Sequence, residues 1–193
     1  MLAHKIITSL SSELTGLPRN NKLKESTDSR NEGWQMTKKI DIDSTKTVTG
    51  SRYPPPYNEP CIGRFRRCLG DAAGLTDFGV NLTRLPAGAW SSQRHWHSAE
   101  DEFIYMVEGE LVLVTDSGEE ILRAGDCAGF RAGIPDGHHL QNRTVKDAVF
   151  LEVGSRRPDE DEVAYPGIDL KVPKGHAGFA HTDGRPYAIA KSR

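Results

Sequence analysis

The chain has 193 residues, of which 36% are apolar, and its 25 basic and 27 acidic residues leave a formal net charge of −2. This composition suits a single domain with the core of a barrel of roughly 110 residues, and it supplies no field that would attract nucleic acid or an anionic membrane, so neither partner is expected. The cysteines, Cys61, Cys68 and Cys127, are odd in number and lack C-x-x-C spacing, which argues against a secreted disulfide framework and favours a cytoplasmic location.

Residues 1–50 are predicted to be largely disordered. They are rich in Ser, Thr, Asn, Lys and Glu, and such a composition buries too little apolar surface to offset the entropy of ordering. Apolar runs near the N-terminus are short and no paired amphipathic helices are visible, so neither a signal peptide nor a membrane span nor a helix-turn-helix is expected. Met36 is an alternative biological start.

Two segments are predicted to flank the barrel. Residues 51–60 contain Tyr53-Pro54-Pro55-Pro56-Tyr57, and they are expected to form an extended arm, because proline fixes φ and lacks the N–H donor that a strand ladder needs. Such an arm often lies along a neighbouring subunit. Residues 157–193 are polar and are expected to form a C-terminal extension that packs on the barrel.

Residues 61–156 have the pattern of an all-β domain. Short apolar or alternating runs are separated by turn signals that recur about every 8 to 12 residues, which is typical of sandwiches and barrels. Beyond a strand at His138, further strands are expected at residues 78–83, 103–107, 111–114, 120–122 and 148–153.

Two imidazoles one residue apart give the strongest chemical signal. His95 and His97 project from the same face of a strand, and Gln93 shares that face, because alternate residues of a strand point the same way. Glu102 can return to this face, and His138 supplies a third imidazole from another strand. Neutral imidazoles and a carboxylate are ligands for ions such as Zn, Mn, Fe or Ni. The pattern therefore predicts a site for one divalent metal ion.

These residues resemble the two motifs of the cupin superfamily of small β-barrels. The first motif is present as His95-x-His97-x4-Glu102-x6-Gly109. The second begins at Gly125 and, after two extra residues, ends in His138-x3-Asn142. The resemblance implies an all-β fold with a single cupin barrel, of the double-stranded β-helix or jelly-roll-like type, and the four residues above as metal ligands. It also implies a homodimer formed through exchanged N-terminal strands or arms.

Some assignments within the site stay open. Family spacing selects Glu102, and Glu100 is the fallback because it has the same strand parity. Placing apolar Leu140 inside the barrel makes His138 the inward imidazole in preference to His139. Gln93 is the expected non-ligand polar group of a substrate pocket. Several other residues are interpreted as solvated or outward-facing: Arg94, Trp96, Arg131 and Arg143.

Three functions are compatible with such a site and a small-molecule ligand. The first is a metal-dependent enzyme on a small oxygenated metabolite, of the sugar-phosphate-isomerase kind, in which the metal polarises a carbonyl while a base moves a proton. The sequence does not identify that base. The second is an oxygenase with Fe(II) on the same ligands, and the third is a non-catalytic sensor or storage protein. The fold alone does not choose among them.

Overall fold

The computed structural model describes residues 39–175 and 178–188. The predicted disorder of residues 1–38 therefore lies outside the described residues. Residues 39–50, which the sequence analysis also assigned to the disordered segment, contain the 3-10 helix η1 (Ile42–Ser44) and the strand β1 (Thr47–Thr49). The hydrogen bonds of β1 come from β2 (Phe65–Cys68), so this order depends on a partner distant in sequence and not on the local composition.

The larger sheet has six antiparallel strands in the order β1-β2-β3-β10-β5-β8. A short helix, α2, spans Leu69–Ala72 after β2. β3 and β10 pair along their whole length, from Leu85 opposite Ala148 to Phe78 opposite Ser155. The other strands of this sheet have the bounds β3 (Phe78–Leu85), β5 (Glu102–Glu108), β8 (Cys127–Phe130) and β10 (Ala148–Ser155).

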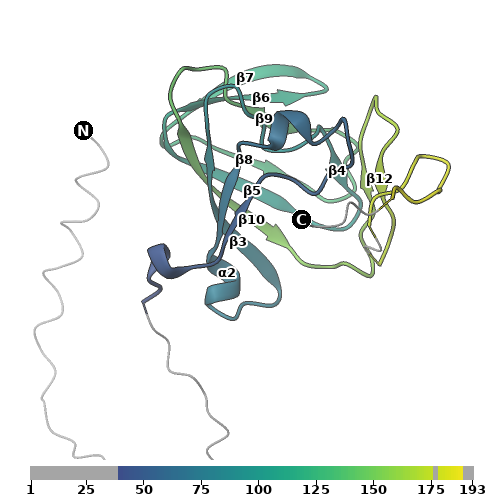
Figure 1. The fold of residues 1–193 in the computed structure, drawn as a ribbon, viewed down its shortest axis with the longest axis horizontal. Helices are drawn as coiled ribbons and strands as arrows, with labels where there is room; N and C mark the ends of the chain where they lie inside the picture. Colours follow the sequence, from purple (N-terminus) through teal and green to yellow (C-terminus); the bar gives the residue numbers. More distant parts are fainter. Residues whose placement is uncertain (1–38, 176–177, 189–193) are drawn as a thin grey trace, which may run out of the picture. The chain divides into compact units, whose positions relative to one another are not determined.

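Two smaller sheets complete the fold. One has the order β7-β6-β9, with β6 (Glu110–Thr115), β7 (Gly118–Arg123) and β9 (His139–Gln141). The other has the order β12-β11-β4, with β4 (Trp96–His97), β11 (Val163–Ala164) and β12 (Lys171–Val172). Figure 1 shows β6, β7 and β9 together above β8, β5, β10 and β3.

The sequence predicted one closed barrel, whereas the three sheets are not joined into a closed barrel within residues 39–175 and 178–188. The chain leaves the six-stranded sheet at Gly109, which has a φ of +80°. A side chain there would also meet Ala148 and the Asp147 carbonyl oxygen at 3.0 Å. Glycine therefore permits the turn that sends β6 into the smaller sheet with β7 and β9.

The main core lies between the six-stranded sheet and the sheet of β6, β7 and β9. Along β5, Ile104 and Met106 are buried, whereas Phe103, Tyr105 and Val107 are exposed, as the alternation of a strand requires. The buried residues come from both sheets and the adjoining turns: Leu85, Ala89, Ile104, Met106, Leu111, Leu113, Leu122, Leu140, Ala148 and Phe150. Burial of this apolar set supplies the main driving force for joining the sheets.

A second apolar cluster joins the proline-rich arm to the C-terminal segment of the same chain. Val163, Tyr165 and Leu170 are buried, and Tyr53 and Tyr57 of the arm pack against them. The arm is not extended throughout, because the 3-10 helix η2 (Glu59–Cys61) ends it. Association of the chain into a homodimer stays a prediction. No helix in the described part of the chain is long and apolar enough to cross a bilayer.

Candidate metal centre

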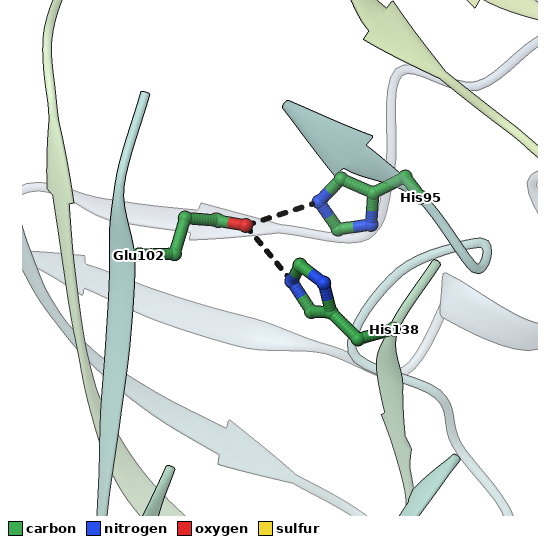
Figure 2. A group of neighbouring side chains, drawn as sticks. All are labelled: His95, Glu102 and His138. Carbon is green, nitrogen blue, oxygen red and sulfur yellow. Dashed lines mark hydrogen bonds and ion pairs between the residues drawn. The ribbon is translucent and has the colours of Figure 1, made fainter. Parts of the chain in front are cut away.

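Three imidazoles converge on one carboxylate oxygen of Glu102. The Nε2 atoms of His95, His97 and His138 lie 3.5, 3.6 and 2.9 Å from Oε2 of Glu102. Figure 2 shows this carboxylate directed at His95 and His138. The structure thus brings together all four residues that the sequence analysis proposed as ligands.

Backbone pairing explains the convergence. His95 and His138 form an isolated β-bridge, in which each backbone N–H donates to the other residue's carbonyl oxygen at 3.1 and 2.8 Å. Their rings therefore lie 4.9 Å apart, centroid to centroid. Glu102 starts β5, opposite Gly154 of β10 and Phe130 of β8, and this register presents its side chain to the two imidazoles.

The second ring nitrogens of His95 and His97 are already occupied. His95 Nδ1 lies 2.9 Å from the Gln93 carbonyl oxygen, and His97 Nδ1 lies 2.7 Å from Oδ2 of Asp161. A carbonyl and a carboxylate can only accept, so both imidazoles donate from Nδ1, and their neutral forms carry a lone pair on Nε2. In these neutral forms two lone pairs face the carboxylate of Glu102, and a positive charge between them, either a bound cation or a proton shared with Glu102, stabilises the arrangement. The donor set fits a divalent cation.

His138 completes the set with the opposite tautomer. Its Nδ1 is buried and has no hydrogen-bond partner among the described residues, which is compatible with donation from Nε2 to Glu102 at 2.9 Å. Binding of a cation by the same Nε2 atom would require this proton to move to Nδ1, which frees the lone pair of Nε2.

The pKa shifts of Glu102 and His138 match this assignment. Removal from water raises the pKa of Glu102, but hydrogen bonds from His138 and His95 outweigh that effect and hold the pKa well below its usual value. Burial lowers the pKa of His138. Burial also acts to lower the pKa of His95, yet the hydrogen bond and charge of Glu102 raise it overall. Near neutral pH, Glu102 is therefore ionised and His138 neutral, as metal ligation requires.

His139 faces away from the cluster. Its Nδ1 donates to the Ser92 carbonyl oxygen at 3.0 Å, and its ring packs edge-on against Trp90. Burial lowers the pKa of His139 to about 4, so it is a neutral core side chain. The choice of His138 from strand parity agrees with this placement.

Asp161 is a residue that the sequence analysis did not identify. Its side chain is fully buried, and besides His97 it accepts hydrogen bonds from the Ala99 N–H at 2.8 Å and the Ser98 hydroxyl at 3.4 Å. A carboxylate behind a ligating histidine fixes the tautomer and orientation of the ring. The only sequence signal is its place in the acidic run 159–162, which does not show that one member is buried.

A cavity of about 220 Å³ opens beside the cluster. It is lined by Trp96, His97, Glu100, Glu102, Gly129, Phe130, Arg131, Ile134, Asp136 and His138. Trp96 and Arg131 therefore contribute to the cavity wall, although they were expected to face outward or into solvent. Trp96 belongs to the two-residue strand β4, and Arg131 follows the last residue of β8. Neither lies inside a long regular strand, so strict alternation does not apply to them.

Gln93 is not among the residues that line this cavity. Its amide nitrogen donates to the Tyr57 carbonyl oxygen at 2.6 Å, so it holds the proline-rich arm to the segment that carries His95. Tyr165 supports the same segment, because its ring stacks on His95 with centroids 5.8 Å apart. Gln93, which was expected to face a substrate pocket, therefore makes a structural contact instead.

Comparison with known proteins gives one coherent result. Residues 81–154 match the cupin domain. A crystal structure of a sugar phosphate isomerase from a cupin superfamily, from Silicibacter pomeroyi, is 45% identical over 79% of this chain and 100% of that chain, with a TM-score of 0.73. A candidate sugar phosphate isomerase from Acidithiobacillus ferrooxidans is 25% identical over 75% of this chain and 91% of that chain, with a TM-score of 0.62.

A more distant structure shares the fold alone. The polyketide cyclase RemF from Streptomyces resistomycificus is 19% identical over 73% of this chain and 91% of that chain, with a TM-score of 0.55. Curated protein sequences gave no significant match.

Proposed function

This chain belongs to the cupin superfamily, and on that premise we propose that it is a metal-dependent isomerase of a small sugar phosphate. The observation that carries the proposal is the open cavity against the His and Glu cluster, because a cavity at the ligands admits a small molecule to them. Its volume of about 220 Å³ is below the roughly 300–1,000 Å³ of pockets for drug-sized ligands. The reaction class is supported by the similarity to the Silicibacter pomeroyi protein.

The cluster would hold one divalent ion, which supplies Lewis-acid polarisation of a substrate carbonyl when it is bound. We assign the proton transfer to Glu100, which lines the cavity beside His97. The backbone N–H of Arg157 donates to Glu100 Oε1 at 2.5 Å, whereas Oε2 has only the more distant His97 Nδ1 at 3.9 Å, so we assign Oε2 to the substrate. Glu100 Oε2 would take the proton from the carbon next to the carbonyl and return it to the former carbonyl carbon, while a hydroxyl proton moves between the two oxygens.

Solvent exchange tests this function. The metal-loaded protein is incubated in D2O with a panel of aldose and ketose phosphates, and proton NMR follows the carbon-bound hydrogens. We expect deuterium at the carbon next to the carbonyl together with the isomeric product, because the proton on Glu100 exchanges with solvent. A chelator should stop the reaction, and addition of the metal should restore it.

Glu100→Gln is the matched variant, since it keeps the size of the side chain and removes the base. It should retain metal and lose exchange by roughly 100-fold or more. The isomerase proposal would be wrong if metal-loaded protein exchanged and converted none of these compounds. Metal-dependent oxygen consumption instead would favour the Fe(II) oxygenase.

A further inference from the structure

Arg131 is the one Lys or Arg among the described residues that line the cavity. The other two arginines that the sequence analysis considered already have partners. Arg94 contacts Asp116, and Arg143 binds Glu119 through two hydrogen bonds of 2.6 and 2.7 Å. Within residues 39–175 and 178–188, the guanidinium of Arg131 makes no hydrogen bond or ion pair. It therefore has its donors available to a ligand in the cavity.

The backbone around Arg131 is fixed to the metal centre. The N–H of Gly133 donates to the carbonyl oxygen of His97 at 2.8 Å, and the N–H of Ala132 donates to Oδ1 of Asp101 at 2.8 Å. These two contacts attach the loop to the proposed ligand His97 and to Asp101, which precedes the proposed ligand Glu102. The loop that carries Arg131 is thus held at a defined position beside the cluster.

The carboxylates of the cavity wall have hydrogen-bond donors other than Arg131, so they do not occupy its guanidinium. Glu100 accepts the N–H of Arg157, Asp136 accepts the N–H of Asp116 at 2.8 Å, and Glu102 is directed at the histidines. Each negative group therefore has a donor of its own. Trp96, Phe130 and Ile134 add apolar surface to the wall, while Arg131 itself is exposed and accessible to a ligand that enters the cavity.

We propose that Arg131 binds the anionic group of the substrate while its carbonyl end lies at the metal centre. The proposal rests on the proposed function for the metal centre and names the group that selects the substrate. A guanidinium offers a planar fork of donors that matches the oxygens of a phosphate or a carboxylate. Both anions share this chemistry, and the experiment below separates them.

The test is an anion titration of zinc-loaded protein followed by proton–nitrogen NMR. Inorganic phosphate and acetate are the probes, and the signals are the Arg131 side-chain N–H and the backbone N–H groups of Ala132 and Gly133. We expect saturable shifts at these positions, and an affinity at least about tenfold weaker in Arg131→Gln, because a charge-assisted bidentate contact is lost. Tighter binding of phosphate than of acetate assigns the site to a phosphorylated substrate, and the reverse assigns it to a carboxylate.

Arg123→Gln is the matched control for the change in charge. Arg123 pairs with Glu110 at 3.1 Å, is well exposed and is absent from the cavity wall, so its substitution should leave the titration unchanged. Equal affinities in wild type and Arg131→Gln, or no saturable shift with either anion, would overturn the proposal. Metal content is measured separately. A wild-type protein that binds no metal would overturn the proposed function, whereas the anion titration alone decides the role of Arg131.

Discussion

His138→Ala is expected to abolish stoichiometric metal binding, whereas His139→Ala is expected to retain it. His138 Nε2 faces Glu102 at 2.9 Å, while His139 Nδ1 is used by the Ser92 carbonyl oxygen. A ligand that binds only the folded state stabilises it by about 2.7 kcal/mol at a hundredfold excess over Kd. His138→Ala should lose this increment, so a chelator should lower the melting temperature of wild type and His139→Ala but not of His138→Ala.

The chelator response is the appropriate measurement because both substitutions remove a buried ring. His139 is almost fully buried and packs on Trp90, so His139→Ala should itself lower the melting temperature through the cavity that it leaves. Metal content after gel filtration provides the second readout. Retention of metal by His138→Ala together with its loss in His139→Ala would show that the two extra residues of the second motif exchange the roles of these histidines.

Asp161→Asn is expected to weaken zinc affinity by about 10- to 100-fold without unfolding the protein. The buried carboxylate accepts a hydrogen bond from His97 Nδ1 at 2.7 Å. An asparagine that turns its NH2 group to this nitrogen would require the tautomer with a proton on Nε2, and that proton would occupy the lone pair directed at the cation. If the amide turns the other way, its NH2 group opposes the Ala99 N–H that the aspartate accepts.

A second His and Asp pair in the same chain is the matched control. His181 Nδ1 also lies 2.7 Å from an aspartate, Asp169, but neither residue belongs to the proposed ligand set. Asp169→Asn should therefore leave zinc affinity unchanged in competition with a chromophoric chelator. Nitrogen NMR of the imidazoles reports the tautomer of His97 directly. An unaltered affinity and an unaltered tautomer in Asp161→Asn would reduce Asp161 to a purely structural group.

Local patterns in the sequence predicted several strands because strands depend on short-range alternation. The expected strands at 103–107 and 111–114 fall inside β5 and β6. Among the four residues proposed as ligands, His95 and His97 were paired by strand parity, and Glu102 and His138 by the spacing of the family motifs. In the structure they meet through long-range pairing such as the bridge of His95 with His138. Within one strand, side-chain direction is a local property that the sequence displays.

Features that depend on distant contacts were not predicted. Asp161 lies 64 residues beyond the His97 that it orients, and its burial follows from the pairing of β11 with β4. Arg131 lies in a loop whose direction is set by hydrogen bonds to His97 and Asp101, so no periodicity in the sequence reports it. The strand at residues 47–49 likewise depends on the pairing of β1 with β2.

The metal content of the native protein, purified without a chelator, is the most direct test of the central claim that His95, His97, Glu102 and His138 bind one divalent ion. Elemental analysis should find about one such ion per chain, or stoichiometric uptake of added zinc, and His97→Ala should lose it because one of the three converging imidazoles is gone. The element found would also separate isomerase chemistry from iron-dependent oxygen chemistry. A wild-type protein that contained no divalent metal and took up none in the titration would contradict the account, as would full occupancy in His97→Ala.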